Sequence, residues 1–141
     1  MTTVAEPDSA LVRRMLTETR AIAVVGASIK PERPSHFVSR YLQQRGYRIL
    51  PVNPGYVGQR ILGEPVAASL AELTQRPEMV AIFRRSVFAG DVARDAIARG
   101  IRFVWMQVGI RDDGAAAEVR SRGGAVVMNR CLMVEHRRLF G

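Results

Sequence analysis

Residues 21–37 read AIAVVGASIKPERPSHF and carry the clearest structural signal in the chain. The stretch opens with five apolar residues, Ala21–Val25, which is typical of a parallel strand buried on both faces. Gly26 ends the run and allows a tight turn that a ligand can approach closely. Pro34 and Ser35 then begin a helix, and helix N-termini attract anions. We therefore expect a strand, a loop and a helix that together can hold a phosphate group.

The same alternation of strand and helix patterns continues to the end of the chain. Strands are expected at Ala21–Gly26, Tyr47–Val52, Met79–Phe83, Phe103–Val108 and Ala125–Met128. Helices are expected at Pro7–Arg20, Pro34–Arg45, Ser86–Arg99, Asp112–Arg122 and Leu132–Leu139. This order predicts an α/β fold: a doubly wound, mainly parallel five-stranded Rossmann-like sheet with helices on both faces, in a single domain over residues 1–141.

Finer features are also expected. Asp8 or Ser9 should cap the first helix. Ser69 should open a short helix through a capping box with Glu72. The glycine- and proline-rich stretch from Asn53 to Val66 should be irregular. In the helix at Ser86–Arg99, helical spacing predicts that four residues face inward: Val87, Val92, Ala93 and Ile97.

Composition indicates a globular protein with one core. The chain has 141 residues, of which 48% are hydrophobic. No apolar run approaches the roughly 20 residues of a membrane span. The Met1–Ser9 segment lacks a basic region followed by an apolar block, so no secretory signal is expected. The single cysteine, Cys131, excludes an internal disulfide and suits a reducing cytoplasm. We expect a cytoplasmic protein without a membrane partner.

The charge is strongly positive, with a net value of +8. This favours a polyanionic small molecule, nucleic acid or an anionic surface, or it reflects a general preference for arginine, since Lys30 is the sole lysine. The arginines are scattered and aromatic residues make up only 6%. Nucleic-acid binding usually needs a concentrated basic stripe or stacking aromatic residues. A nucleic-acid partner is therefore not expected.

Ligands of such sheets lie beyond the carboxyl ends of the strands. After the first strand, Ser28 offers a hydroxyl, and Lys30 and Arg33 add positive charge; the alternative is a plain turn with solvated cations. Dinucleotide enzymes usually carry an acidic residue at the end of the second strand, to bind ribose hydroxyls. Asn53 stands there instead, beside Pro54, so the segment that follows the second strand is uncharged and stiff. This segment can pack against a base or simply form a rigid turn.

Catalytic signals are weak. His36 and His136 are far apart and lack ligand spacing with Cys131, so no metal site is predicted. His36 near the helix start either contacts a phosphate or lies on the surface, and His136 with Glu135 is expected to be a solvated pair. Cys131 precedes a predicted helix start, which would stabilise a thiolate. The alternative is an inert, small apolar residue.

Five segments in order resemble the CoA-binding protein family, whose domain also forms the N-terminal part of the α subunit of succinyl-CoA synthetase. They are VVGAS, RPSHFVSRYLQQRGYRILPVNP, ILGEPVAASLAEL, FRRSVFAGDVARDAIARGIRFVWMQVGI and VVMNRCLMVEHRRL. The resemblance implies a Rossmann-like domain that binds coenzyme A across the strand ends. The segments that resemble the family do not include the second domain of the synthetase, which carries its catalytic phosphohistidine.

The resemblance also implies which residues bind coenzyme A. They are Gly26, Ala27, Ser28, Val52, Asn53, Pro54, Tyr56, Phe83, Arg84, Met106 and Gln107. The synthetase has a lysine where this chain has Tyr56, so that anion contact is either lost or supplied by another cation. The candidates are Lys30, Arg33, Arg40 and Arg84, and Ser35 joins the site through its place at the helix start.

The expected function is binding of CoA or acyl-CoA by a binding or regulatory module without catalytic machinery of its own, with homo-oligomerisation left open. One alternative is an enzyme, either NAD(P)-linked or one half of a split acyl-CoA ligase. The other is a nucleic-acid-binding module, which only the net charge supports.

Overall fold

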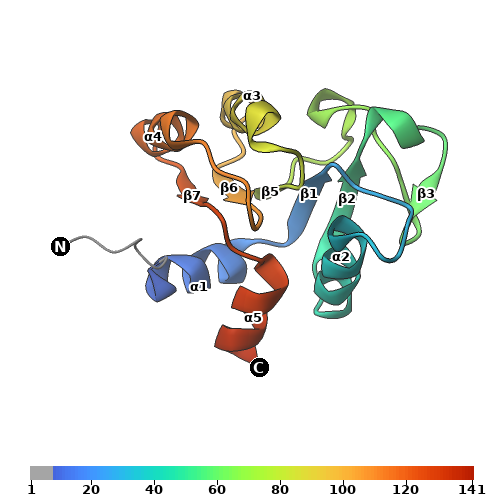
Figure 1. Cartoon of the computed structure of the whole chain (residues 1–141), viewed down its shortest axis with the longest axis horizontal. Coiled ribbons are helices and arrows are strands. Elements are labelled where there is room, and N and C mark those ends of the chain that lie inside the picture. Colours follow the sequence, from blue (N-terminus) through green and yellow to red (C-terminus); the bar gives the residue numbers. More distant parts are fainter. Residues whose placement is uncertain (1–7) are drawn as a thin grey trace.

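The computed structural model describes residues 8–141. The expected helix start at Pro7, and all of the Met1–Ser9 segment before Asp8, lie outside this range. Five parallel strands form the central sheet in the order β2-β1-β5-β6-β7 (Figure 1). Their bounds are Ala21–Val25 (β1), Arg48–Val52 (β2), Met79–Ile82 (β5), Phe103–Met106 (β6) and Ala125–Val127 (β7). The predicted α/β fold, with its five-stranded parallel sheet, is confirmed.

Helices cover both faces of the sheet, as predicted (Figure 1). One face carries α1 (Ser9–Glu18), α2 (Pro34–Gln44) and α5 (Leu132–Phe140), and the other carries α3 (Ser86–Ala98) and α4 (Asp113–Ser121). Asp8 caps α1, since its carboxylate accepts a hydrogen bond from the Ala10 amide at 3.0 Å. Among the described residues, no helix is both long enough and apolar enough to cross a bilayer.

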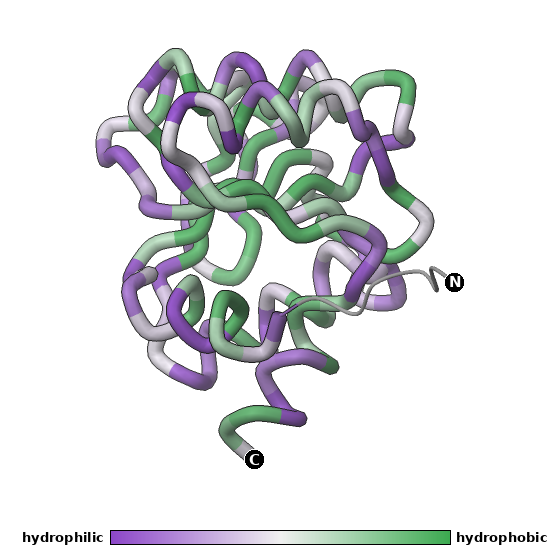
Figure 2. Tube along the Cα trace, turned by 90° about the vertical axis from the view of Figure 1, so that its left-hand side faces the viewer, coloured by the Kyte–Doolittle hydropathy of each residue, from purple (hydrophilic) through white to green (hydrophobic). Residues whose placement is uncertain are grey.

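The core lies in two layers, one on each side of the sheet. All five residues of β1 are buried. Because successive strand residues point to opposite faces, Ile22 and Val24 pack under α1, α2 and α5, whereas Ala23 and Val25 pack under α3 and α4. Figure 2 shows the apolar segments concentrated in these central strands. This double burial explains why β1 is a continuous apolar run.

The strand order places a switch point between β1 and β5. From β1 the chain passes through α2 to β2 on one side, and it later crosses back to β5 on the other side of β1. Since α2 and α3 cover opposite faces, the loops after β1 and β5 diverge at the carboxyl edge. Such a divergence opens a crevice for a ligand.

The stretch expected to be irregular is partly ordered. It contains the 3₁₀ turn η1 (Pro54–Tyr56) and a small hairpin of β3 (Arg60–Ile61) and β4 (Glu64–Pro65). Leu62 and Gly63 form the hairpin turn with φ values of 53° and 82°. Positive φ at both turn positions matches the twist of a two-residue hairpin, which is why so short a pair forms. The expectation of a wholly irregular stretch was wrong.

The predicted capping box at Ser69 was also wrong. Only a 3₁₀ turn, η2 (Leu70–Glu72), follows Ser69, and the Ser69 side chain makes no capping hydrogen bond. The Glu72 amide instead donates to the Ser69 carbonyl at 3.1 Å. A single 3₁₀ turn satisfies its own amide in this way, so the side chain has no capping role.

The inward face of α3 agrees with the prediction at Val92, Ala93 and Ile97 and differs from it at Val87. Val87 is 75% exposed, and the buried stripe consists of Ala89, Ala93 and Ala96, with Val92 and Ile97 half-buried. These alanines are small, so α3 packs closely against the sheet and α4.

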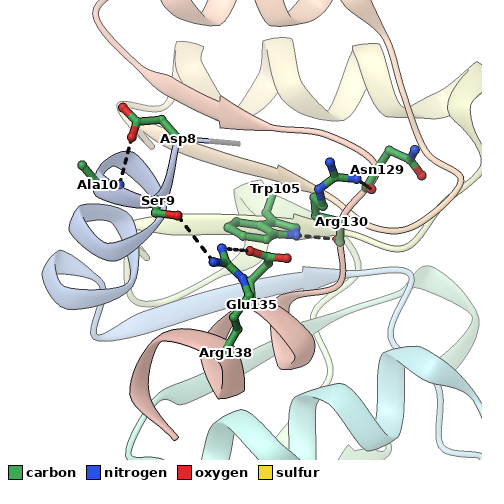
Figure 3. Close-up of polar contacts among 8 residues, drawn as sticks. All are labelled: Asp8, Ser9, Ala10, Trp105, Asn129, Arg130, Glu135 and Arg138. Atoms are coloured by element: carbon green, nitrogen blue, oxygen red, sulfur yellow. Dashed lines mark hydrogen bonds and ion pairs between the residues drawn. The ribbon is translucent and has the colours of Figure 1, made fainter. Parts of the chain in front are cut away.

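The last helix is buried where the sequence predicted a solvated pair. Glu135 and His136 are only 6% and 7% exposed. His136 Nδ1 lies 2.9 Å from the Tyr41 hydroxyl of α2. The Arg138 guanidinium donates to Glu135 at 2.6 Å and to Ser9 of α1 at 3.4 Å (Figure 3). These contacts fix α5 between α1 and α2.

Candidate ligand-binding site

A cleft of about 520 Å³ opens at the carboxyl edge of the sheet. Its walls come from the loop after β1, the first turn of α2, and the ends of β2, β5, β6 and β7. The lining residues are Gly26, Ala27, Ser28, Lys30, Arg33, Pro34, Ser35, Phe37, Val38, Asn53, Tyr56, Phe83, Gln107, Val108, Ile110 and Cys131. A concave site of this size and mixed lining suits a small organic ligand.

The cleft floor is backbone, because Gly26 has no side chain. Gly26 has a φ of +91°, and its amide donates to the Val52 carbonyl at 3.0 Å. A Cβ at this position would lie 3.2 Å from the carbonyl carbon and oxygen of Phe83. Glycine is therefore needed both for the turn and for the close approach of the loops after β1 and β5.

Asn53 joins the loops after β1 and β2. Its amide nitrogen donates to the Ala27 carbonyl at 2.8 Å, and its side-chain oxygen accepts from the Gly55 amide at 2.9 Å. An aspartate would lose the first of these bonds and place a carboxylate against a carbonyl oxygen. The neutral residue is thus a requirement of this loop packing, and it leaves the cleft without an acidic ribose clamp.

The positive side of the cleft is the start of α2. Lys30 and Arg33 are exposed and line the opening, and Ser35 is buried in the first turn. His36 Nδ1 donates to the Ser28 carbonyl at 2.9 Å. His36 is therefore half-buried and holds the loop, although it is not among the lining residues. The helix N-terminus and the two cations make this end of the cleft attractive to anions.

The far end of the cleft is formed by the starts of the loops after β6 and β7. Gln107 is 5% exposed, and its side-chain oxygen accepts from the Leu132 amide at 2.9 Å, so it orients the start of α5. Cys131 is the residue before α5 and is half-buried in the cleft wall. Trp105 Nε1 donates to the Arg130 carbonyl at 2.8 Å and holds this loop against β6 (Figure 3).

The structure brings together ten of the fifteen residues expected to bind the ligand. The cleft contains Gly26, Ala27, Ser28, Lys30, Arg33, Ser35, Asn53, Tyr56, Phe83 and Gln107. Three others, Val52, Pro54 and Arg84, line a second hollow of about 380 Å³ on the α3 side of the same strand ends. At three strand ends, consecutive residues line different hollows. Gly26, Asn53 and Phe83 line the cleft, and their neighbours Val25, Val52 and Arg84 line the second hollow.

The two remaining residues lie elsewhere. The Met106 side chain is fully buried in the core layer under α3 and α4, so it faces no cleft. Arg40 lies farther along α2, in a separate hollow between α2 and α5.

Sequence reasoning missed several lining residues, among them Phe37, Val108 and Ile110. Val108 was expected at the end of the strand Phe103–Val108, whereas β6 ends at Met106 and residues 107–110 form a turn. The signal that was available is Gly109, which directly follows the apolar run. Gly109 has a φ of +82° and closes this turn. Within residues 8–141, no three histidine, cysteine, aspartate or glutamate side chains are placed to hold a metal ion.

Comparison with known proteins identifies the family. The model of the CoA binding domain matches residues 20–137. The chain belongs to the CoA-binding domain family. Uncharacterized protein YneT of Bacillus subtilis (strain 168) is 35% identical over 130 residues, which are 92% of this chain and 95% of YneT. The resemblance noted in the sequence is confirmed at the level of this family.

Solved structures agree on the fold of this CoA-binding domain. The structure of cell-free ID.343 from Thermus thermophilus has a TM-score of 0.89 and 40% identity, covering 94% of this chain and 99% of that one. A fold likeness also extends to acetyl-coenzyme A synthetase 1 of Ca. Korarchaeum cryptofilum, with a TM-score of 0.64 and 22% identity. That match covers 77% of this chain but only 25% of the synthetase chain.

Proposed function

We propose that this protein binds coenzyme A or an acyl-CoA across the carboxyl edge of its sheet, as a binding or regulatory module. The observation that carries the proposal is that the CoA-binding domain match, at residues 20–137, includes every residue lining the cleft. The segment that matches the CoA-binding domain therefore contains the whole lining of a cleft that attracts anions.

The residues present fit the chemistry of coenzyme A. The ligand carries a pyrophosphate, which suits the Gly26 turn and the start of α2, with Lys30 and Arg33 supplying charge. Its pantetheine arm is long and amide-rich. It fits the path past Phe83 and Val108 toward Cys131, because this wall combines apolar side chains with backbone groups at strand ends.

The second hollow fits the adenosine part of the ligand. Val25, Val52, Pro54 and Leu70 form an apolar wall that suits a base, and Asp91 and Asp95 of α3 line the same hollow, where carboxylates can accept hydrogen bonds from ribose hydroxyls. The Arg84 guanidinium lies 4.1 Å from the centroid of the Phe88 ring at the rim of this hollow. From there it can meet a ribose phosphate, and a cation is the group that such a phosphate needs.

A dinucleotide fits less well. The end of β2 offers the amide of Asn53, which is already bonded to Ala27 and Gly55, and no carboxylate for a ribose. The histidines are also committed: His36 bonds to Ser28 and His136 to Tyr41. A binding role accounts for these residues without a catalytic step.

Native mass spectrometry of the gently purified protein tests this proposal, because it weighs a retained ligand directly. The protein is measured as purified and after mixing with equal amounts of CoA and NAD⁺. We expect a single CoA or acyl-CoA per chain. Retention of NAD⁺ in the presence of equal CoA, or of neither ligand, would contradict the proposal.

A further inference from the structure

A hollow outside the cleft combines exposed arginines with an apolar wall. It has a volume of about 460 Å³ and lies between α2 and α5. Arg40 from α2 and Arg137 from α5 are both exposed at this hollow, and Phe37, Tyr41 and Met133 supply apolar surface. No aspartate or glutamate lines it. A hollow with two guanidinium groups and no carboxylate favours an anion.

The positive charge of this hollow is not neutralised by the chain. Within residues 8–141, neither Arg40 nor Arg137 forms an ion pair. The acidic side chain of α5, Glu135, binds Arg138 and points toward α1 (Figure 3). A third guanidinium, that of Arg45, lies 4.5 Å from the centroid of the Tyr41 ring.

The direction of the pKa shift of His136, which follows from burial and from the charge of Arg45, is consistent with a positive environment near the hollow. Burial lowers the pKa of His136, and the charge of Arg45 lowers it further. His136 is therefore held neutral near neutral pH, where its ring bonds to Tyr41. A carboxylate close by would have the opposite effect on this pKa.

The hollow adjoins the cleft along α2 and the start of α5, and Pro31 of the loop after β1 also lines it. Phe37 lines both of them. Cys131 lines the cleft, and Met133, two residues farther along, lines the hollow. A group that leaves the cleft past Cys131 and Phe37 therefore enters the space between α2 and α5. If the phosphates of the ligand lie at the Gly26 turn, the group at this position is the acyl group on the CoA sulfur.

We propose that the hollow between α2 and α5 is an acyl subsite, and that it selects CoA thioesters whose acyl group ends in a carboxylate. Arg40 and Arg137 bind that carboxylate, and Phe37 and Met133 pack against the methylene chain. Arginine suits this role because its planar fork matches a carboxylate with two parallel hydrogen bonds. This inference rests on the proposed function and names the ligand class of the same site.

Calorimetric titration with matched thioesters tests the inference. Succinyl-CoA is compared with butyryl-CoA and adipyl-CoA with hexanoyl-CoA, because each pair differs in charge at nearly equal length. We expect at least one dicarboxylic thioester to bind about tenfold more tightly than its uncharged partner, the gain typical of a charge-assisted hydrogen bond. The Arg40→Gln/Arg137→Gln variant should lose this preference while its affinity for free CoA and butyryl-CoA is unchanged.

Two controls make the outcomes distinct. Arg122→Gln changes an exposed arginine after α4, on the opposite face of the sheet, and should keep the preference. Dephospho-CoA distinguishes a carboxylate from a nucleotide phosphate as the bound anion. If the arginine variant loses affinity for CoA but not for dephospho-CoA, the hollow holds a phosphate and the inference is overturned.

The remaining outcomes also separate the two proposals. Equal binding of charged and uncharged thioesters by the wild type, with CoA still bound, overturns the acyl subsite and leaves the proposed function standing. Failure of CoA and of every thioester to bind overturns both. Because Arg40 and Arg137 are exposed, the variants should melt as the wild type does, which circular dichroism checks.

Discussion

Gly26 shows how a single residue serves the fold and the candidate site together. Its positive φ turns the chain out of β1, and its missing side chain lets the loops after β1 and β5 approach to van der Waals contact. The same absence leaves backbone as the floor of the cleft. Asn53 acts in a comparable way, since its side chain joins two loops while keeping the end of β2 neutral.

Replacing Gly26 by valine should abolish CoA binding. The side chain would press on the Phe83 carbonyl and fill the floor of the cleft. Gly46→Val is the matched control: Gly46 has a φ of +98°, but a Cβ there meets nothing within 4 Å. Each variant should lose about 1–3 kcal/mol of stability through backbone strain. Thermal melts and CoA titrations of both variants check this.

The two variants should therefore differ in binding far more than in stability. The Gly46 variant should bind CoA as the wild type does, because Gly46 follows α2 at the end away from the cleft. Normal CoA affinity in a folded Gly26→Val protein would show that this loop does not face the ligand.

At the scale of elements, the five main helices could be predicted because their apolar residues recur at helical spacing, and the five strands because they are continuous apolar runs. A short, continuous apolar run such as β1 favours a strand that is buried on both faces. The failures have local physical causes. The β3–β4 hairpin depends on a turn at Leu62 and Gly63, and positive φ at a leucine has no clear sequence signature. On α3 only Val87 was wrongly expected to face inward, and the buried stripe there consists largely of alanines.

The candidate site was less predictable than the elements that carry it. Residues at strand ends, such as Gly26 and Gln107, could be placed because parallel strands bring their carboxyl ends to one edge. Met106 was misplaced because it belongs to the strand and points into the core. Arg40 was misplaced because the sequence does not reveal that this side of α2 meets α5.

The contact between α2 and α5 predicts a pH dependence of stability. Burial, aided by the charge of Arg45, lowers the folded-state pKa of His136 below its ordinary value of 6.5. The unfolded chain then takes up this proton more readily than the folded chain. The contribution is fully present above about pH 6.5 and is lost as the pH falls toward the lowered pKa.

Urea unfolding at about pH 7 and about pH 5.5 measures this dependence. The wild type should be less stable at the lower pH. His136→Gln keeps a polar partner for Tyr41 but does not titrate, so its stability should change less between the two conditions. An equal loss in both proteins would assign the pH dependence to other groups.

At the scale of the whole molecule, only some of the residues behind the net charge of +8 lie at the candidate site. Lys30 and Arg33 line the cleft, and Arg84 lines the hollow beside it. Other arginines are in ion pairs on the surface, for example Arg99 with Asp95 and Arg111 with Asp113. Exposed pairs of this kind contribute little to stability. The cations proposed to meet the CoA phosphates therefore lie at the carboxyl edge of the sheet.

This arrangement predicts a salt-dependent affinity. CoA binding should weaken as ionic strength rises, because charges at an open cleft are screened. Lys30→Gln/Arg33→Gln should weaken CoA binding by about tenfold and flatten the salt dependence. The Arg120→Gln/Arg122→Gln variant makes the same change in charge at the end of α4, away from both hollows, and should do neither. A wild-type affinity that does not respond to salt would show that the phosphates bind elsewhere.

Calorimetric titration of the wild-type protein with CoA, NAD⁺ and NADP⁺ tests the central claim most directly. The claim is that this Rossmann-like domain, with a neutral Asn53 where dinucleotide enzymes carry an acid, binds coenzyme A at its strand ends. The predicted result is one CoA per chain, bound more tightly than either dinucleotide. Equal or reversed affinities would contradict it.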